Sequence, residues 1–506
     1  MKKPTPLPRA SHLNSGTAVP RDELAWPADS GPVLRTPKLH TEIDERAVVT
    51  PYGGLILVEQ FCRRFKVAQL IDQEVHVLKL HMPFHESDHI LAQALNLYVG
   101  GQTLEDLSNL QHDEAVKRML GACRLPDPTT AGDFLRRFSA TSLDQLRFAI
   151  DQLQEEVWLK LARSQRGRKS KRPQAVVYLD GHIKELYGVR MEGADFSHTG
   201  QWSYSALVAS LAGSGESLAV RLRPGNVRSS EGAAEVLNDV LPRLREHFEE
   251  ILVVADSDFD RADVREACQH AGAWFAFVGR EHADRPKLAD TVEQWRKFRP
   301  RAERAVEQRR RSDDYRPRKR RPNHRRKRAC ERKFTELRLV RQLVGEVSWT
   351  PPGCDGRLRL IVRRQHIDRF EAKQGQLFET YRDRYIVTNL PPSWSTGEVV
   401  DATYLRCDQE NVIEQLGSGL AMWRMPVKQF VGNQAWMEIA RLAWNLRVWI
   451  AQLVLPEETS RWEWKRFRQA FVFLAAQVLY HARQVWIRFA NSHRFAPLLL
   501  AAHLRL

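Results

Sequence analysis

The chain has 506 residues, 43% of them hydrophobic, which is enough apolar material for the cores of two to four domains. Its formal net charge of +16 favours a polyanionic partner. The six cysteines are scattered without a CxxC pair, so neither a zinc ribbon nor a disulfide framework is indicated.

No segment of the sequence is typical of export or of a membrane span. The start, MKKPTPLPRASH, lacks the apolar stretch of a signal peptide. The most apolar uncharged stretch, from Gln469 to Tyr480, has 12 residues. A helix that spans a bilayer needs roughly 20. We therefore expect a cytoplasmic protein without membrane contact, in which this stretch belongs to a helix of a soluble domain.

The first third of the chain divides into an arm and a helical domain. Residues 1–44 are rich in proline, serine, glycine and charge and have no apolar period, which predicts a flexible arm. Residues 45–164 carry apolar residues three and four apart, which predicts a helical N-terminal domain. Thr130 and Asp133 have the spacing of a capping box at the start of one helix.

Two apolar segments end in acidic residues, and both are typical of buried strands. Residues 175–180 are AVVYLD, and residues 251–260 are ILVVADSDFD. A strand that is covered on both faces presents the residues after it at an edge of the sheet, so Asp180 and Asp256 are expected at such an edge. An aspartate there either contributes to a metal site or caps the next helix.

The segments around these two strands predict an α/β layer structure. They are, in chain order, strands at 202–209 and 217–223, a helix through Leu244 that Ser229 or Ser230 would cap, a helix at 261–272 and a strand at 274–278.

A third acid lies in a helical segment far downstream. Glu410 follows Arg406 by four residues, so both are expected on one helix face. The chain between Asp256 and Glu410 is longer than one strand and one helix require, which predicts an insert at 284–400. Carboxylates are the ligands of hard divalent cations, and a pair of such ions can cleave a phosphodiester.

The insert contains the most basic part of the chain. Residues 309–333 include fourteen lysines and arginines against three acids. This run would bind DNA phosphates whatever the base sequence, either as an ordered groove or as a disordered tail. We expect helices near 300–311 and 328–344 and strands at 358–362, 377–381 and 385–388. The DNA-binding candidates are Arg318, Lys319, Arg320, Arg321, Arg325, Arg326, Lys327 and Arg328.

The last part of the chain, residues 421–506, again has apolar residues at helical spacing, which predicts a helical C-terminal region. It contains four tryptophans, which we expect to lie in the core, since stacking on bases is the rarer use of such a pattern. They are Trp436, Trp444, Trp449 and Trp486.

The order of these motifs resembles that of the DDE group 1 transposases of bacterial insertion sequences. Asp180 is followed by LRPGNVRSSEGA at 222–233, then by ADSDF, and then by Arg406-x-x-x-Glu410. The similarity covers most of residues 45–490. It implies an α/β RNase H-like catalytic core, a mixed sheet flanked by helices, in two parts at 173–283 and 401–420. A basic mixed α/β insert would interrupt this core between the helical N-terminal and C-terminal regions.

The resemblance also implies a function and its residues. The chain would be a DNA transposase that cleaves at the element ends and transfers the strand into target DNA. Asp180, Asp256 and Glu410 would be catalytic and would hold two ions of Mg²⁺ or Mn²⁺. Arg406 and Tyr404 would contact DNA.

Three positions depart from the family pattern or lie beside it. Related transposases carry Tyr-x-x-Arg-x-x-x-Glu followed by a lysine, whereas Tyr404 is one residue closer to the arginine and Gly417 replaces the lysine. Asp258 stands where the family usually has glycine, either as a fourth ligand or as the mark of a divergent copy. His182 lies close to Asp180 in sequence, and a structural role is expected for it.

The expected partners are the element ends and the target DNA, bound by a homodimer in a synaptic complex in the bacterial cytoplasm. The helical domain at 45–164 would bind the ends or would only brace the core. Two alternative functions stay open. One is a catalytically inactive DNA-binding protein derived from a transposase, and the other is an RNase H-like nuclease without strand transfer.

Overall fold

The structure is a computed structural model that describes residues 41, 43–44, 46–164, 171–280, 282–311, 337–351, 356–369, 380–482, 484–490 and 493–506. Nearly all of the predicted arm and all eight candidates of the basic run lie outside these residues. The chain divides into two compact units. The helical unit comprises Met1–Ser164, Arg190–Glu192 and Glu414–Leu506, and the sheet unit comprises Gln165–Val189 and Gly193–Ile413.

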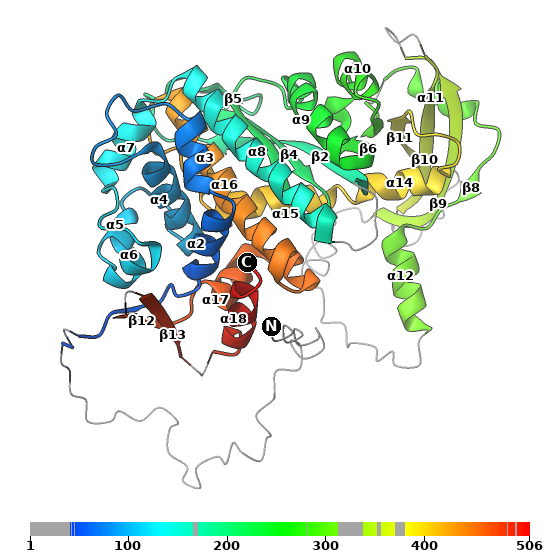
Figure 1. The fold of residues 1–506 in the computed structure, drawn as a ribbon. Coiled ribbons are helices and arrows are strands. Elements are labelled where there is room, and N and C mark those ends of the chain that lie inside the picture. The colour runs from blue at the N-terminus through cyan, green and yellow to red at the C-terminus, as the bar shows by residue number, and fades with distance from the viewer. Residues whose placement is uncertain are drawn as a thin grey trace, which may run out of the picture. The chain divides into compact units, whose positions relative to one another are not determined.

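The sheet unit contains, in the described part of the chain, one mixed sheet of ten strands (Figure 1). Their order is β3-β4-β2-β6-β7-β11-β10-β9-β8, and β5 also pairs with β4. The strands are β2 (Arg172–Glu185), β3 (Asp195–Phe196), β4 (Trp202–Leu211), β5 (Glu216–Pro224), β6 (Phe248–Ala255), β7 (Trp274–Val278), β8 (Arg296–Lys297), β9 (Leu337–Trp349), β10 (Leu358–Arg369) and β11 (Thr380–Thr388).

The centre of this sheet has the predicted mixed pairing. Strands β2, β6 and β7 are parallel, while β4 and β5 are antiparallel neighbours on the side of β2. The helices of this unit are α9 (Ala233–His247), α10 (Ala262–His270), α11 (Arg285–Asp290), α12 (Arg301–Arg310), α14 (Thr396–Tyr404) and α15 (Cys407–Glu414), with a short turn η1 (Ser257–Phe259). The predicted fold class, a mixed sheet flanked by helices, is confirmed.

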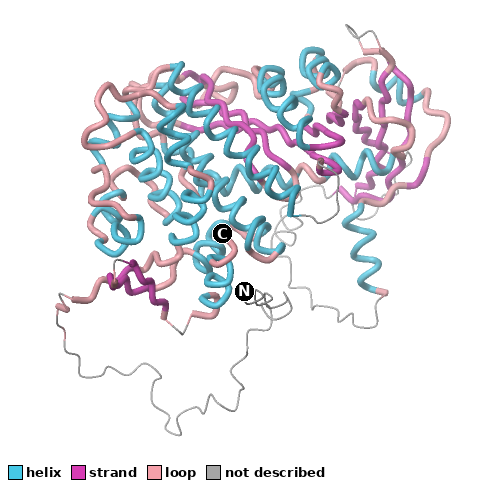
Figure 2. The backbone as a smooth tube through the Cα atoms, viewed as in Figure 1, coloured by secondary structure: helices cyan, strands magenta, loops and turns pink. Residues whose placement is uncertain are grey.

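Strand β6 is buried on both faces because helices cover both sides of it (Figure 2). Leu252 and Val254 belong to a core cluster with Val399 and Val400 of α14. Their neighbours in sequence face the opposite side, since side chains alternate along a strand. On that side β6 contacts α9. The unbroken apolar run that predicted this strand therefore follows from a two-sided cover.

The insert is part of the same sheet and of the same core. Strand β11 pairs antiparallel with β7, and β10 pairs with both β11 and β9. Val344, Ile361 and Ile386 of these strands pack in the cluster that contains Leu252. The mixed insert is therefore a continuation of the central sheet, attached through β7.

Two predictions within the insert are wrong. Residues 337–349, where the prediction had a helix through 344, form β9, because this segment pairs with β10 along its length and tertiary pairing outweighs local helix propensity. The described parts of the two strands predicted at 377–381 and 385–388 belong to one strand, β11, and residues 377–379 lie outside the described residues. The predicted helix near 300–311 is present as α12.

Two predicted helix caps are replaced by neighbouring residues. Helix α9 starts after Gly232, whose φ of 75° suits glycine, so neither Ser229 nor Ser230 is its N-cap. Helix α7 (Pro128–Arg136) is capped by Asp127, which accepts a hydrogen bond from the Thr130 backbone N–H at 3.0 Å. The proline at the first helical position explains this earlier start.

The helical unit is built from both ends of the chain. Its elements are α2 (Leu55–Arg64), α3 (Val67–Glu74), α4 (Glu86–Val99), α5 (Leu107–Gln111), α6 (Glu114–Leu120), α7, α8 (Ala140–Ser164), η2 (Gln415–Gly419), η3 (Met422–Arg424), α16 (Phe430–Val454), η4 (Glu457–Arg461), α17 (Trp464–Phe471), α18 (Ala496–His503) and the strands β1 (Val49–Thr50), β12 (Ala476–His481) and β13 (Gln484–Phe489).

Helix α16 lies at the centre of the helical unit and contacts α2, α4, α7 and α8. Trp436, Trp444 and Trp449 are buried on it, as predicted for core tryptophans, while Trp486 on β13 is half exposed. A buried pair, Glu438 and Arg441, extends to α8, where Arg147 contacts Glu438. The N-terminal and C-terminal helical regions, predicted as separate parts, therefore share one core.

The end of the chain is not entirely helical. Strands β12 and β13 form a hairpin, and β12 also pairs with β1. The expected helix at Gln469–Tyr480 is therefore wrong after Phe471, because partners on both sides of β12 satisfy its backbone as a strand. No helix within the described ranges combines the length and the apolar character that crossing a membrane requires.

Candidate active site

Asp180 and Asp256 occupy matching positions where the parallel pairing of β2 with β6 stops. The last residues that these two strands pair are Leu179 and Ala255, so Asp180 is the next residue of β2, which continues to Glu185, and Asp256 directly follows the end of β6. Neighbouring strands are roughly 4.8 Å apart. In each aspartate the Oδ1 atom accepts a backbone N–H at 2.9 Å, from Gly181 in one case and from Asp258 in the other. Asp256 thus caps η1 and still presents its Oδ2 atom.

The turn between α14 and α15 brings the third acid to the same place. Arg406 lies between the two helices, and its Nη1 is 3.2 Å from Asp180 Oδ2 and 3.9 Å from Asp256 Oδ2. Its Nη2 is 3.9 Å from Glu410 Oε1. We call Asp180, Asp256 and Glu410, gathered around Arg406, the acid cluster. Residues far apart in the sequence thus converge, as the motif order predicts.

Gln409, which is not among the site residues predicted from the sequence, anchors the helix that carries Glu410. Its side chain is fully buried, its Nε2 donates to the Val208 carbonyl at 3.2 Å, and its Oε1 accepts from the Ser210 hydroxyl. Both partners lie on β4. The sequence could have predicted that Gln409 is buried, because Gln409, Val412 and Leu416 have helical spacing and form one buried stripe.

The charges of the acid cluster are unbalanced. Burial raises the pKa of Asp180 to about 6, Arg406 opposes this shift, and the charge of Asp256 adds to it. Burial also raises the pKa of Asp256, and Asp258 adds to that shift. Glu410 is the most accessible of the three, with 65% of its side chain exposed. Three carboxylates against one guanidinium leave an excess of negative charge that a cation would neutralise.

The donor set of the acid cluster fits a hard divalent cation, because all three side chains offer carboxylate oxygens. At present the guanidinium of Arg406 gathers these oxygens. Among the described residues, no three His, Cys, Asp or Glu side chains stand in an arrangement that could hold a metal ion directly. Cation binding at the acid cluster therefore requires Arg406 to withdraw from its centre.

Packing fixes the residues at two further positions of the family signature, Tyr404 and Gly417. Tyr404, the last residue of α14, packs against the core cluster that contains Leu252. The guanidinium carbon of Arg363 lies 4.7 Å from the centroid of its ring. Gly417, at the lysine position, has no room for a side chain, since a Cβ atom there would lie 2.3 Å from Trp423. The absence of the lysine is therefore a packing requirement of η2 and η3.

Asp258 and His182 differ in their relation to the acid cluster. Asp258 is exposed, and its part in holding Asp256 is played by its backbone N–H. His182 lies two residues after Asp180 on β2 and so on the same face of the sheet. Burial and the nearby Lys184 lower the pKa of His182, which keeps its ring neutral at pH 7.

The motif at 222–233 starts at the end of β5, continues as a loop beside Asp180 and ends at the first residue of α9. Arg223 donates to the carbonyls of Arg228 and Ser229 at 3.2 and 3.0 Å, and to the Ser205 hydroxyl at 3.0 Å. A Cβ atom at Gly181 would lie 2.9 Å from the Ser229 Cβ. Gly181 and Arg223 therefore allow this loop to approach the strand position next to the catalytic candidate.

Arg280 supports the turn after Asp256, and the sequence analysis missed this residue too. Its Nε donates to the Ser257 carbonyl at 3.0 Å, and its Nη2 donates to the Asp258 carbonyl at 2.9 Å. Its position in the sequence could have identified it as a neighbour of Asp256. Arg280 comes two residues after β7, and the C-terminal ends of parallel strands lie at one edge of a sheet.

Comparisons with known proteins bear on the whole chain. A family model described as transposase DDE domain group 1 matches residues 33–506. A search of curated protein sequences finds no match. Among solved structures, a piggyBac transposase seen by cryo-electron microscopy in a synaptic complex with hairpin DNA is similar, at 10% identity and a TM-score of 0.36. The match covers 84% of this chain and 83% of that chain.

Proposed function

Since this chain belongs to the group 1 DDE transposases, whose family model spans nearly all of it, we propose that it mobilises a bacterial insertion sequence. Members of this family act on DNA, generally with divalent metal ions, so the chain is an enzyme of DNA cleavage and transfer. The proposal adds the specific route, which is cleavage at the element ends and attack of the freed 3′-hydroxyl on target DNA.

The observation that carries the proposal is the convergence of Asp180, Asp256 and Glu410 around one cationic group. In the proposed roles, these carboxylates hold two ions of Mg²⁺ or Mn²⁺. When bound, the ions would activate the attacking oxygen and stabilise the leaving oxygen. Gln409 and Arg280 keep the acids in position through Val208 and through the turn after Asp256.

Arg406 has two successive partners in this proposal. Without a cation it neutralises the acid cluster, and its nearest contact is with Asp180. Once cations replace it there, its guanidinium is free to hold a DNA phosphate, for which its forked donors are well suited. The basic run from Arg318 to Arg328 would add phosphate contacts, and the helical unit would recognise the element ends within a homodimer.

The test uses the purified full chain, Mn²⁺ and duplexes that carry the inverted repeats beside its gene. Asp180→Asn, Asp256→Asn and Glu410→Gln should each lower strand nicking by about 10³-fold or more, because each removes a proposed metal ligand. Asp408→Asn is the matched control, since Asp408 is an exposed carboxylate on the same helix. It should nick at the rate of the wild type.

The products separate the proposal from its alternatives. Joint molecules of donor and target DNA would support transposition. Nicking without joint molecules would favour a nuclease, and end-specific binding without nicking would favour an inactive DNA-binding protein. Nicking that persists in all three acid variants would overturn the assigned site.

A further inference from the structure

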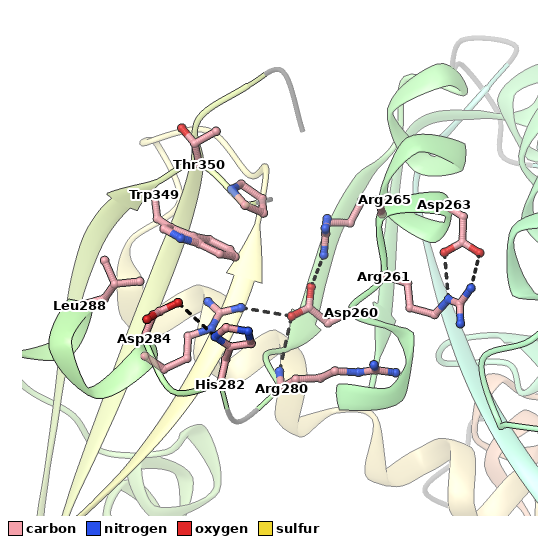
Figure 3. A pocket seen from close by; sticks show the side chains of 13 residues that line it. Asp260, Arg261, Asp263, Arg265, Arg280, His282, Asp284, Leu288, Trp349 and Thr350 are labelled. Atoms are coloured by element: carbon pink, nitrogen blue, oxygen red, sulfur yellow. Dashed lines mark hydrogen bonds and ion pairs between the residues drawn. The ribbon is translucent and has the colours of Figure 1, made fainter. Parts of the chain in front are cut away.

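A second group of charged residues lies directly after the turn that holds Asp256. Figure 3 shows a pocket with Asp260 and Arg265 on one side and Trp349 and Thr350 on the other. Its volume is about 610 Å³, within the range of ligand sites. We call it the arginine pocket, because Arg261, Arg265, Arg280 and Arg285 line it.

The buried charges of this pocket are positive in sum. Asp260 is almost fully buried and lies 2.5 Å from Arg265 and 3.3 Å from Arg285, which are equally buried. One carboxylate therefore faces two guanidinium groups. The other charged residues on the wall do not change this balance, because Arg261 is paired with Asp263 and the charges of Arg280 and Asp284 are opposite.

Two donors of these buried arginines are unused. Within the described part of the chain, neither Arg265 Nε nor Arg285 Nη1 has a hydrogen-bond partner. Buried donors are nearly always satisfied, so such a pair calls for a missing acceptor. The ring of Trp349 lies 4.0 Å from the guanidinium carbon of Arg285 and holds its plane in place. Burial lowers the pKa of Arg285, which is the sign of an incompletely compensated cation.

The place of the pocket limits its ligand. Asp260 ends the short turn that starts at Asp256, and Arg280 spans this turn by its hydrogen bonds to Ser257 and Asp258. The pocket therefore lies along the same sheet edge as the acid cluster. A DNA strand with one phosphate at the acid cluster carries further phosphates on both sides of it. Phosphate oxygens are also the acceptors that arginine donors match best.

We propose that the arginine pocket binds a phosphodiester of the DNA strand that passes the acid cluster, with Arg265 and Arg285 as its donors. This inference rests on the proposed function. It adds a subsite for a phosphate other than the one that reacts, so the pocket would set the register of the strand on the acids.

The test measures how the affinity for a duplex with the inverted repeats depends on KCl, with Ca²⁺ in place of Mn²⁺. The slope of log K against log salt is negative, and loss of one phosphate contact lowers its magnitude, which is the quantity compared below, by about 0.9. We expect this decrease for Arg285→Gln and Arg265→Gln. Arg359→Gln is the control, since Arg359 is a partly buried arginine of the same unit that is bonded to Glu346 and to carbonyls outside the pocket.

A second pair of variants avoids the buried network. Thr350 is exposed and lines the pocket, so its replacement is compatible with folding. Thr350→Glu places a carboxylate on the wall of the pocket, where it would repel a phosphate, and should lower the magnitude of the slope, whereas Thr350→Gln should match the wild type. Unchanged slopes in Arg285→Gln and Thr350→Glu would overturn the inference. A reduced slope in Thr350→Gln or Arg359→Gln would overturn it as well.

Titration with inorganic phosphate separates two sources of the ligand. If the wild type binds free phosphate through Arg285 while its DNA slope is independent of Arg285, the pocket serves a free anion and the DNA subsite is wrong. If the wild type does not bind the duplex at all, the proposed function fails. In that case, binding of free phosphate that is lost in Arg285→Gln would still support an anion site in the pocket. If the wild type does not bind free phosphate either, the anion site is wrong.

Discussion

The acid cluster and the arginine pocket use the same side-chain types in opposite proportions. In the acid cluster three carboxylates surround Arg406, whereas in the arginine pocket Arg265 and Arg285 share the single carboxylate of Asp260. The two groups are joined by the turn from Asp256 to Asp260. An excess of acid calls for a cation, and an excess of guanidinium calls for an anion. Side by side, they suit the metal ions and the phosphates of one DNA strand.

They also differ in how far they are closed from water. Glu410 has 65% of its side chain exposed, while the side chain of Asp260 is only 3% exposed. The acid cluster can therefore exchange its cationic partner, which suits a site that loads metal ions. The arginine pocket keeps its internal ion pairs, so removal of one partner should be far more costly there.

Asp260→Asn should have the largest effect on stability. It leaves Arg265 and Arg285 buried without a carboxylate, so the free energy of unfolding should fall by about 3–5 kcal/mol. Chemical denaturation measures this change. Asp258→Asn is the control, because Asp258 is exposed two residues away, and it should change stability little. A loss below about 1 kcal/mol for Asp260→Asn would mean that the pair is not buried as described.

Asp180→Asn should stabilise the protein at pH 7. The pKa of Asp180 in the fold, about 6, is above its unfolded value of roughly 3.9, so the ionised carboxylate costs folding free energy above pH 6. The variant removes this cost and should gain about 1–2 kcal/mol, allowing for the solvent that still reaches the side chain. The gain should disappear as the pH falls from 6 to 4, where the wild-type carboxyl is protonated.

Denaturation in the presence of EDTA at pH 7 and pH 4 measures this difference. Glu410→Gln is the matched control, because its side chain is largely exposed and should contribute little at either pH. A gain that persists at pH 4 would show that removal of the charge is not its cause.

Arg406→Gln should have the smallest effect, on cation affinity in the absence of DNA. The guanidinium lies within 4 Å of all three acids and competes with any cation for them. Its removal should raise Mn²⁺ affinity by about three- to tenfold, measured by calorimetry. Arg406→Lys keeps the charge and should bind Mn²⁺ like the wild type. Unchanged or weaker binding by Arg406→Gln would rule out competition.

The apolar pattern of a strand predicts it correctly where local cover explains that pattern, and wrongly where a distant partner decides the structure. Strand β6 was predictable because a continuous apolar run of five residues is typical of a strand covered on both faces. Strand β9 was predicted in part as a helix, since the spacing of its apolar residues fits a helix as well as a strand. Its pairing with β10 makes it a strand. The hairpin of β12 and β13 was missed for the same reason, because its partner β1 is more than 400 residues away.

The sequence by itself determined the order of the motifs, the buried strands that lead to Asp180 and Asp256, and the helical setting of Glu410, although β2 continues past Asp180 to Glu185. These features are local, because they depend on runs of a few residues and on which side chains carry charge. Tertiary structure alone decided that Arg406 would sit among the acids, that Gln409 would anchor α15 on β4, and that Asp260 would be shared by two arginines. Each of these depends on distances between segments that sequence spacing does not encode, and on burial, which sets the strength of every charge.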